Sequence, residues 1–313
     1  MSELTNPRRT LSTPLPRFIL DFETTGLDRL ADQVLEVGLR GAAKYNALVS
    51  DSRPPSKRAL AVHGLDSRLC RSLGRPSIEV LDHLLRLLGP GPVEVVAHNA
   101  AFERKFLAGW AARHGRDLPV IHWHCTLERA WELVPKAPFS CRLGELAALF
   151  GWPTEGLHGA AVDTALTEQL VEVLDAWGAV RDELGAQPGL VYMAGPFRGD
   201  GTSAVMAQNR ERMAGLSRWA QAVLPEATLV VPHLNFAFAD ESGKRGDQVR
   251  AQVLRSCEEL VKRCGALIQC GQEVTDGMVR EVAVARACGI PVIQVPGWPR
   301  RLRNPELEVK GVA

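Results

Sequence analysis

The chain has 313 residues, of which 46% are hydrophobic and 23% are charged, and its formal net charge is +1. These values are ordinary for globular proteins, so they exclude wholesale disorder, and the length suits two domains of about 150 residues each. No apolar run reaches the roughly 20 residues of a membrane-spanning helix, so no membrane partner is expected. The small net charge gives no general attraction for nucleic acid, although a local basic groove would suffice.

The ends and the cysteines predict a cytoplasmic protein. Residues 1–16 are polar and lack the apolar segment of a signal peptide or anchor, so we expect a loose N-terminal tail there, and a second tail at 300–313. The seven cysteines show no metal-ligand spacing. We expect most of them to be small buried side chains in a reducing compartment.

Hydrophobic periodicity predicts a first α/β domain over 17–179 that opens with antiparallel strands. Apolar runs predict strands at 17–23, 33–40, 44–49, 93–97 and 120–123. Apolar stripes at helical spacing predict helices at 101–114, 126–133, 142–150 and 159–177, and one that starts with Ser77 as its cap and ends before the Gly and Pro residues of 89–92. The interleaving predicts a mixed sheet.

A Gly- and Pro-containing linker at 180–188 separates this domain from a second one over 189–299, in which strands and helices alternate. The expected strands are 190–194, 229–231, 266–270 and 291–295, and the expected helices are 203–224, 248–264 and 277–288. This alternation is typical of a parallel doubly wound sheet, in which ligands bind at the carboxyl ends of the strands.

Two acids end the first strand. Asp21 and Glu23 follow the apolar run Phe18-Ile19-Leu20, and alternation along a strand places both side chains on one side. Two such carboxylates repel each other and are costly to bury. A hard divalent cation, which prefers oxygen ligands, resolves both costs.

Two further acids follow later in the chain. Glu103 stands in the stretch that starts with His98 and Asn99, and Asp163 stands five residues after His158. This order, acid-x-acid, then H-N-x-x-F-acid, then H-x-x-x-x-D, resembles the DEDDh family of 3′-to-5′ exonucleases over residues 17–178. The resemblance implies a ribonuclease H-like fold and release of nucleotides from the 3′ ends of single-stranded DNA or RNA.

The requirements of phosphodiester hydrolysis suggest a role for each of the four acids and for His158. Two metal ions about 4 Å apart activate water and stabilise both the phosphate and the leaving oxygen. We expect Asp21 to bridge two Mg²⁺ or Mn²⁺ ions and the other three acids to complete their ligands. His158 is then the general base. The resemblance further implies that the terminal nucleotide lies near the following residues: Thr24, Thr25, Leu27, His63 and Asn99, the last of which we also expect to brace its loop.

Two positions depart from the family pattern. The family usually has Asp where this chain has Glu103, which is longer by one methylene, and often has Asp where Cys125 precedes Thr126. The change at Cys125 is expected to be neutral. The change at Glu103 leaves an alternative open, in which the chain is a catalytically silent nucleic-acid-binding protein. Each acid alone could also be an ordinary surface or helix-end charge.

The second domain carries its own resemblance. The runs 191–197 and 275–281 resemble nucleoside 2-deoxyribosyltransferase-like proteins, which implies a flavodoxin-like fold, a bound nucleoside or nucleotide, and Glu281 as nucleophile on the sugar. Backbone at a Gly-Pro pair and at a helix start can approach an anion. The expected pocket residues are Gly195, Pro196, Asn209, His233, Asp276, Gly277, Met278 and Glu281. Relatives often have Asp at Gly265, so two alternatives stay open: an active transferase or N-glycosidase, and a nucleotide-sensing module.

Overall fold

The computed structural model describes residues 14–185, 189–197, 199, 201–236, 246–271 and 274–296. The predicted tails lie almost wholly outside these residues, as do positions 186–188 of the predicted linker. The chain divides into two compact units: Met1–Cys125 with His158–Thr164, and Thr126–Leu157 with Ala165–Ala313. In the described part of the chain, no helix is both long and apolar enough to cross a membrane.

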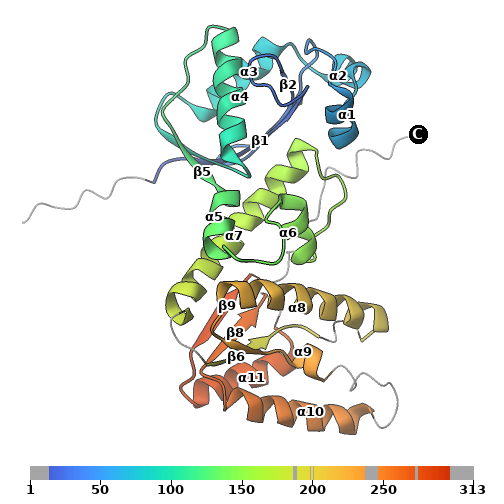
Figure 1. Ribbon diagram of the computed structural model, residues 1–313, viewed down its shortest axis with the longest axis vertical. Coiled ribbons are helices and arrows are strands. Elements are labelled where there is room, and N and C mark those ends of the chain that lie inside the picture. The colour runs from blue at the N-terminus through green and yellow to red at the C-terminus, as the bar shows by residue number, and fades with distance from the viewer. Residues whose placement is uncertain are drawn as a thin grey trace, which may run out of the picture. The chain divides into compact units, whose positions relative to one another are not determined.

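The first unit is built on a five-stranded mixed sheet (Figure 1). Its strands are β1 (Arg17–Thr24), β2 (Val34–Gly41), β3 (Tyr45–Leu48), β4 (Val93–Ala97) and β5 (Ile121–Cys125). They lie in the order β3-β2-β1-β4-β5, with β1-β2 and β2-β3 antiparallel and the other neighbours parallel. The predicted mixed sheet is confirmed, and its topology is that of a ribonuclease H-like fold.

Helices cover the apolar face of this sheet. The unit contains α1 (Lys57–His63), α2 (Ser67–Leu73), α3 (Ser77–Leu88) and α4 (Ala100–Arg113). Phe18, Leu20 and Phe22 alternate along β1 and join one buried cluster with residues of α3 and α4. The opposite side of β1 therefore carries Asp21 and Glu23.

Ser77 does not have the predicted capping role. Pro76 occupies the cap position of α3 without a side-chain hydrogen bond. The Ser77 hydroxyl instead accepts a hydrogen bond of 2.7 Å from the indole Nε1–H of Trp110, which is 1% exposed. A buried indole N–H needs a hydrogen-bond acceptor. The Ser77 hydroxyl accepts from Trp110 and therefore does not cap α3.

The second unit begins with helices that the sequence placed in the first domain. They are α5 (Thr126–Leu133), α6 (Leu143–Leu149) and α7 (Ala160–Leu184), and only the start of α7 belongs to the first unit. Helix α7 runs seven residues past its predicted end, into the predicted linker. Phe150 meets Trp219 edge to face at 5.3 Å, and a Cβ on Gly215 would lie 1.9 Å from the backbone oxygen of Leu149. The segment after α5 is thus packed closely on the helix that contains Trp219.

That helix belongs to a parallel doubly wound layer, as predicted. The strands are β6 (Leu190–Ala194), β7 (Thr228–Val230), β8 (Ala266–Cys270) and β9 (Val292–Val295), in the order β7-β6-β8-β9 and all parallel. The helices are α8 (Ser203–Val223), the unpredicted short α9 (Pro232–Asn235), α10 (Gly246–Val261) and α11 (Asp276–Ala287). Helix α8 covers one face of the sheet, and α10 and α11 cover the other (Figure 1). This order is the start of a flavodoxin-like sheet.

Candidate active site

The polar side of β1 gathers acids from three elements. Glu23 is 9% exposed and Asp21 is partly buried. In the antiparallel register with β2, Asp21 lies opposite Gly38 and Glu23 lies opposite Glu36. Because β1 and β2 are both buried, these carboxylates have little water to solvate them.

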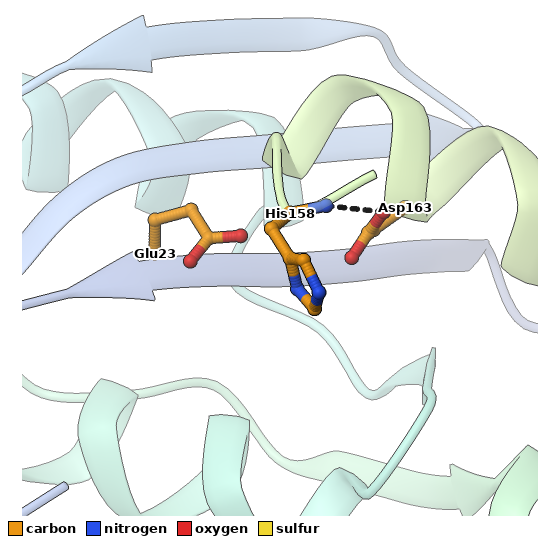
Figure 2. Close-up of side chains that lie close together, drawn as sticks. All are labelled: Glu23, His158 and Asp163. Carbon is orange, nitrogen blue, oxygen red and sulfur yellow. Dashed lines mark hydrogen bonds between the residues drawn. The ribbon is translucent and has the colours of Figure 1, made fainter. Parts of the chain in front are cut away.

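The start of α7 contributes a histidine and a further acid. The backbone N–H of His158 donates to Oδ1 of Asp163 at 3.3 Å. Ligand atoms of Glu23, His158 and Asp163 all lie within 4.8 Å of one another. Figure 2 shows the His158 imidazole between the two carboxylates. This is the one group of three or more potential metal ligands among the described residues, and Asp21 and Glu103 lie outside it.

Glu103 is buried in the first turn of α4. Its side chain is 3% exposed, and its Oε2 has no hydrogen-bond partner within the described part of the chain. Burial, together with the charge of Asp21, raises the pKa of Glu103 well above its usual range. An orphaned buried carboxylate oxygen is costly, and a cation would satisfy it.

The raised pKa values of Asp21, Glu23 and Asp163 are those expected of acids that surround a site for a divalent metal ion. Burial and the charges of Asp163 and Glu36 raise the pKa of Asp21 well above its usual range. Burial and neighbouring carboxylates raise the pKa of Glu23 to about 9. Burial raises the pKa of Asp163 to about 7. All of these oxygens become favourable ligands once a cation balances their charge, so the donor set fits Mg²⁺ or Mn²⁺.

The sequence did not single out Glu36. This glutamate on β2 is 8% exposed, and its Oε2 accepts a hydrogen bond of 3.0 Å from the backbone N–H of Ala160 at the start of α7. A signal was present, since Glu36 interrupts a run from Val34 to Leu39 that is otherwise apolar or glycine. A charge within such a buried strand requires a partner.

The residues predicted to meet the terminal nucleotide have two separate environments. Thr24 and Thr25 are buried, and their hydroxyls donate to Gly26 O at 2.6 Å and to Oδ1 of Asp32 at 2.9 Å. His63 contacts Thr24 O through Nε2 at 3.2 Å. These three residues therefore hold the loop after β1.

Leu27 and Asn99 instead line a shared cavity of about 340 Å³, whose wall also contains Phe102, the cationic Arg29 and Lys105, and the acidic Asp28. Leu27 is 73% exposed. Asn99 has a left-handed backbone with φ 79° and makes no capping hydrogen bond through its side chain. An apolar wall beside two cationic side chains has the composition that a nucleotide base and its phosphate require.

The second unit brings several of its predicted residues to the carboxyl end of β6. His233 contacts Pro196 O through Nε2 at 3.2 Å, and Asn209 donates from Nδ2 to Phe197 O at 3.0 Å. Burial lowers the pKa of His233 to about 4, so its ring is neutral. A Cβ on Gly195 would lie 2.5 Å from the Met213 sulfur, so only glycine fits without a shift there.

Glu281 is buried on α11 beside a tyrosine that we did not predict as a site residue. The Tyr192 hydroxyl donates to Oε1 of Glu281 at 2.7 Å, and burial raises the pKa of Glu281 to about 7. Asp276, Gly277 and Met278 form the first turn of the same helix, where Thr275 Oγ1 accepts from the N–H of Met278 at 3.5 Å. Tyr192 is the third of the five residues of β6 and is fully buried, so its hydroxyl joins Glu281 within the packed interior of the unit.

Comparison with known proteins now bears on this site. Residues 18–171 match the family model described as "Exonuclease". This segment is therefore similar to an exonuclease domain. That segment contains all five predicted catalytic and metal-binding residues. Residues 189–295 match a family described as a "Domain of unknown function (DUF7768)", which gives no support to the deoxyribosyltransferase resemblance.

Two curated relatives are proteins described as "DNA polymerase III PolC-type", from Thermotoga maritima and Thermotoga petrophila. Each is 35% identical to this chain over 98 residues, which is 29% of this chain and 7% of the relative. This chain therefore spans only a small part of their length.

Solved structures of Escherichia coli exonuclease I are also similar. A zinc-bound complex with single-stranded DNA has 17% identity and a TM-score of 0.45 over 54% of this chain and 44% of that one. A complex with a dT13 oligonucleotide has 15% identity and a TM-score of 0.46 over 56% and 44%. At these values the structural similarity is weak, and the assignment rests on the family match.

The raised pKa values predict how stability depends on pH without metal. Native Glu23 and Asp163 have pKa values of about 9 and about 7, above their ordinary values of 4.5 and 3.8, so the native state binds the extra protons. Their stabilisation is complete below pH 4 and is lost as the pH rises through 7 and then 9. We expect the thermal midpoint in chelator to fall between pH 6 and 9, and magnesium to reduce that fall. The measurement is thermal unfolding by circular dichroism.

Asp163→Asn is the matched control, because its neutral amide removes one titrating group. It should show a smaller fall across the same range. A metal-free midpoint that is flat or rises from pH 6 to 9 would contradict the assigned burial and repulsion.

Proposed function

We propose that the segment 18–171, which we call the exonuclease domain, is a metal-dependent 3′-to-5′ exonuclease that acts on single-stranded nucleic acid. The observation that carries this proposal is the convergence of Glu23, His158 and Asp163 within one family-matched segment, beside Asp21 and the orphaned oxygen of Glu103. The curated relatives are named as DNA polymerases, which favours DNA over RNA as the substrate.

In this proposal, different residues bind the metal ions, accept the proton from water and bind the terminal nucleotide. Asp21, Glu23, Glu103 and Asp163 would hold Mg²⁺ or Mn²⁺, which supplies charge for the phosphate and an acidified water. His158 is exposed beside two of these acids and can accept the water proton at its imidazole. Leu27 and Phe102 offer an apolar wall for the terminal base, while Lys105 in the same cavity can pair with a phosphate.

Glu103 supports the active alternative over the silent one. Its longer side chain could have turned to solvent, yet it is 3% exposed with Oε2 unsatisfied in the described part of the chain. A buried carboxylate with one unpaired oxygen supports the hypothesis that Glu103 is a metal ligand in place of the Asp that the family usually has.

The test is cleavage of 5′-labelled single-stranded DNA and RNA of 20 nucleotides with magnesium or manganese. We expect a ladder that shortens from the 3′ end, lost in chelator and reduced at least about 100-fold in Asp163→Ala because the metal ligands act as a unit. Asp175→Ala is the matched control, since it removes an exposed acid from the same helix.

Binding without cleavage in the unchanged protein would favour the silent alternative. Cleavage that persists in Asp163→Ala, or that begins inside the strand, would contradict the proposed mechanism. Glu103→Gln then tests one ligand, and unchanged metal-dependent cleavage would remove Glu103 from the set.

A second candidate function concerns the second unit. We propose that it binds a nucleoside or nucleotide at the carboxyl end of β6. The supporting observations are the contacts of His233 and Asn209 just after that strand, and the buried Tyr192–Glu281 pair, because a carboxyl group with a pKa of about 7 can bond a sugar hydroxyl or a base as donor or acceptor. The alternatives of a sensing module and of a transferase or N-glycosidase both use this pair.

Incubation of the full chain with deoxynucleosides and their monophosphates separates these alternatives. Release of free base that is lost in Glu281→Ala, but kept in the exposed-acid control Glu226→Ala, supports an enzyme. Saturable binding without base release supports a sensor. Neither binding nor release would contradict the nucleoside site.

A further inference from the structure

Strand β2 caps a helix that begins far away in the sequence. Oε2 of Glu36 accepts a hydrogen bond from the N–H of Ala160 at 3.0 Å, across 124 residues of chain. Ala160 is the first residue of α7, and the first N–H groups of a helix have no partner within the helix. The negative charge of Glu36 also suits the positive end of the helix dipole.

The same strand fits closely against this helix start two residues later. A Cβ on Gly38 would lie 2.2 Å from the backbone oxygen of Ala160. Any side chain at this position would push the helix start away from the strand. We call Glu36 and Gly38 together the α7 seat, because one residue bonds Ala160 and the other leaves room for it.

The α7 seat lies next to a strained histidine. His158 has φ 63°, a left-handed conformation that few residues other than glycine adopt. Such a conformation is unfavourable for a residue with a side chain and persists only where the surroundings impose it. Here the backbone is held on both sides, by Asp163 at the N–H of His158 and by Glu36 at the N–H of Ala160.

We propose that Glu36 is a positioning residue of the exonuclease site, which holds the start of α7 so that His158 and Asp163 stay beside Glu23. This inference rests on the proposed exonuclease function. Glu36 acts through Ala160 and does not touch the reacting atoms. Its charge is also unfavourable for its neighbours, since it helps to raise the pKa of Asp21. An apolar side chain would remove that repulsion but would leave the buried N–H of Ala160 without this partner.

Two variants of similar size separate the hydrogen bond from the charge. Glu36→Gln keeps an oxygen that can accept from Ala160, whereas Glu36→Met has nearly the same length and no acceptor. We expect Glu36→Met to lower kcat at least about tenfold, with the KM for a 20-nucleotide strand within about twofold, since it displaces His158 but not the substrate cavity. Glu36→Gln should recover kcat to within about threefold of the original.

Gly38→Ala disturbs the α7 seat from its other residue and should repeat the effect of Glu36→Met. Glu79→Ala, which removes an exposed glutamate from α3, is the control expected to change nothing. Equal losses in Glu36→Gln and Glu36→Met would overturn the proposal, because charge and not the hydrogen bond would then matter. Unchanged kcat in Glu36→Met would overturn it as well.

Amide hydrogen exchange of the peptide 158–164 gives a readout that does not need activity. In the full chain, exchange should become faster in Glu36→Met and Gly38→Ala and should stay slow in Glu36→Gln. This measurement also separates the two proposals. If the protein cleaves nothing but the exchange pattern holds, the exonuclease function fails while the seat is correct, and if exchange is the same in all variants, the seat itself is wrong.

Discussion

Repulsion among buried carboxylates is the constraint on which the first unit depends. Asp21, Glu23, Glu36 and Asp163 share one side of a buried pair of strands, and Glu103 adds a fifth acid whose oxygen lacks a partner among the described residues. Backbone N–H groups bond Glu36 and Asp163, but burial and mutual repulsion still raise the pKa values of Asp21, Glu23 and Asp163. A divalent cation would balance these charges, and this is the basis of the metal site that we propose for the cluster.

The second unit also contains a buried carboxyl group, on α11. Glu281 is buried to a comparable degree, but it receives a hydrogen bond from Tyr192 and its pKa rises only to about 7. A single protonatable carboxyl group suits recognition of a hydroxyl or a base, whereas a cluster of carboxylates suits a phosphate with its metal. The two proposed sites therefore differ in chemistry, and they belong to two α/β sheets, one mixed and one parallel.

Local patterns in the sequence predicted the strands of both sheets and the long helices, but they missed the short helices α1, α2 and α9. Alternation along β1 predicted that Asp21 and Glu23 share a side, and the parallel sheet of β6 to β9 followed from alternating strands and helices. Partners far apart in sequence could not be predicted, because periodicity does not encode them. The Ser77 hydroxyl forms a hydrogen bond with Trp110 and so does not cap its helix. Glu36 accepts a hydrogen bond from Ala160, and Tyr192 donates one to Glu281 across 89 residues. The domain boundary and the roles of the site residues stay predictions.

Titration of the metal-free chain with Mn²⁺ at pH 8, followed by calorimetry, tests the central claim most directly. The account predicts about two ions per chain, bound with release of protons from the carboxyls with raised pKa values, and weaker binding in Asp21→Asn. Absence of binding, or binding with no proton release and no change in Asp21→Asn, would contradict the view that this cluster is built around a divalent cation.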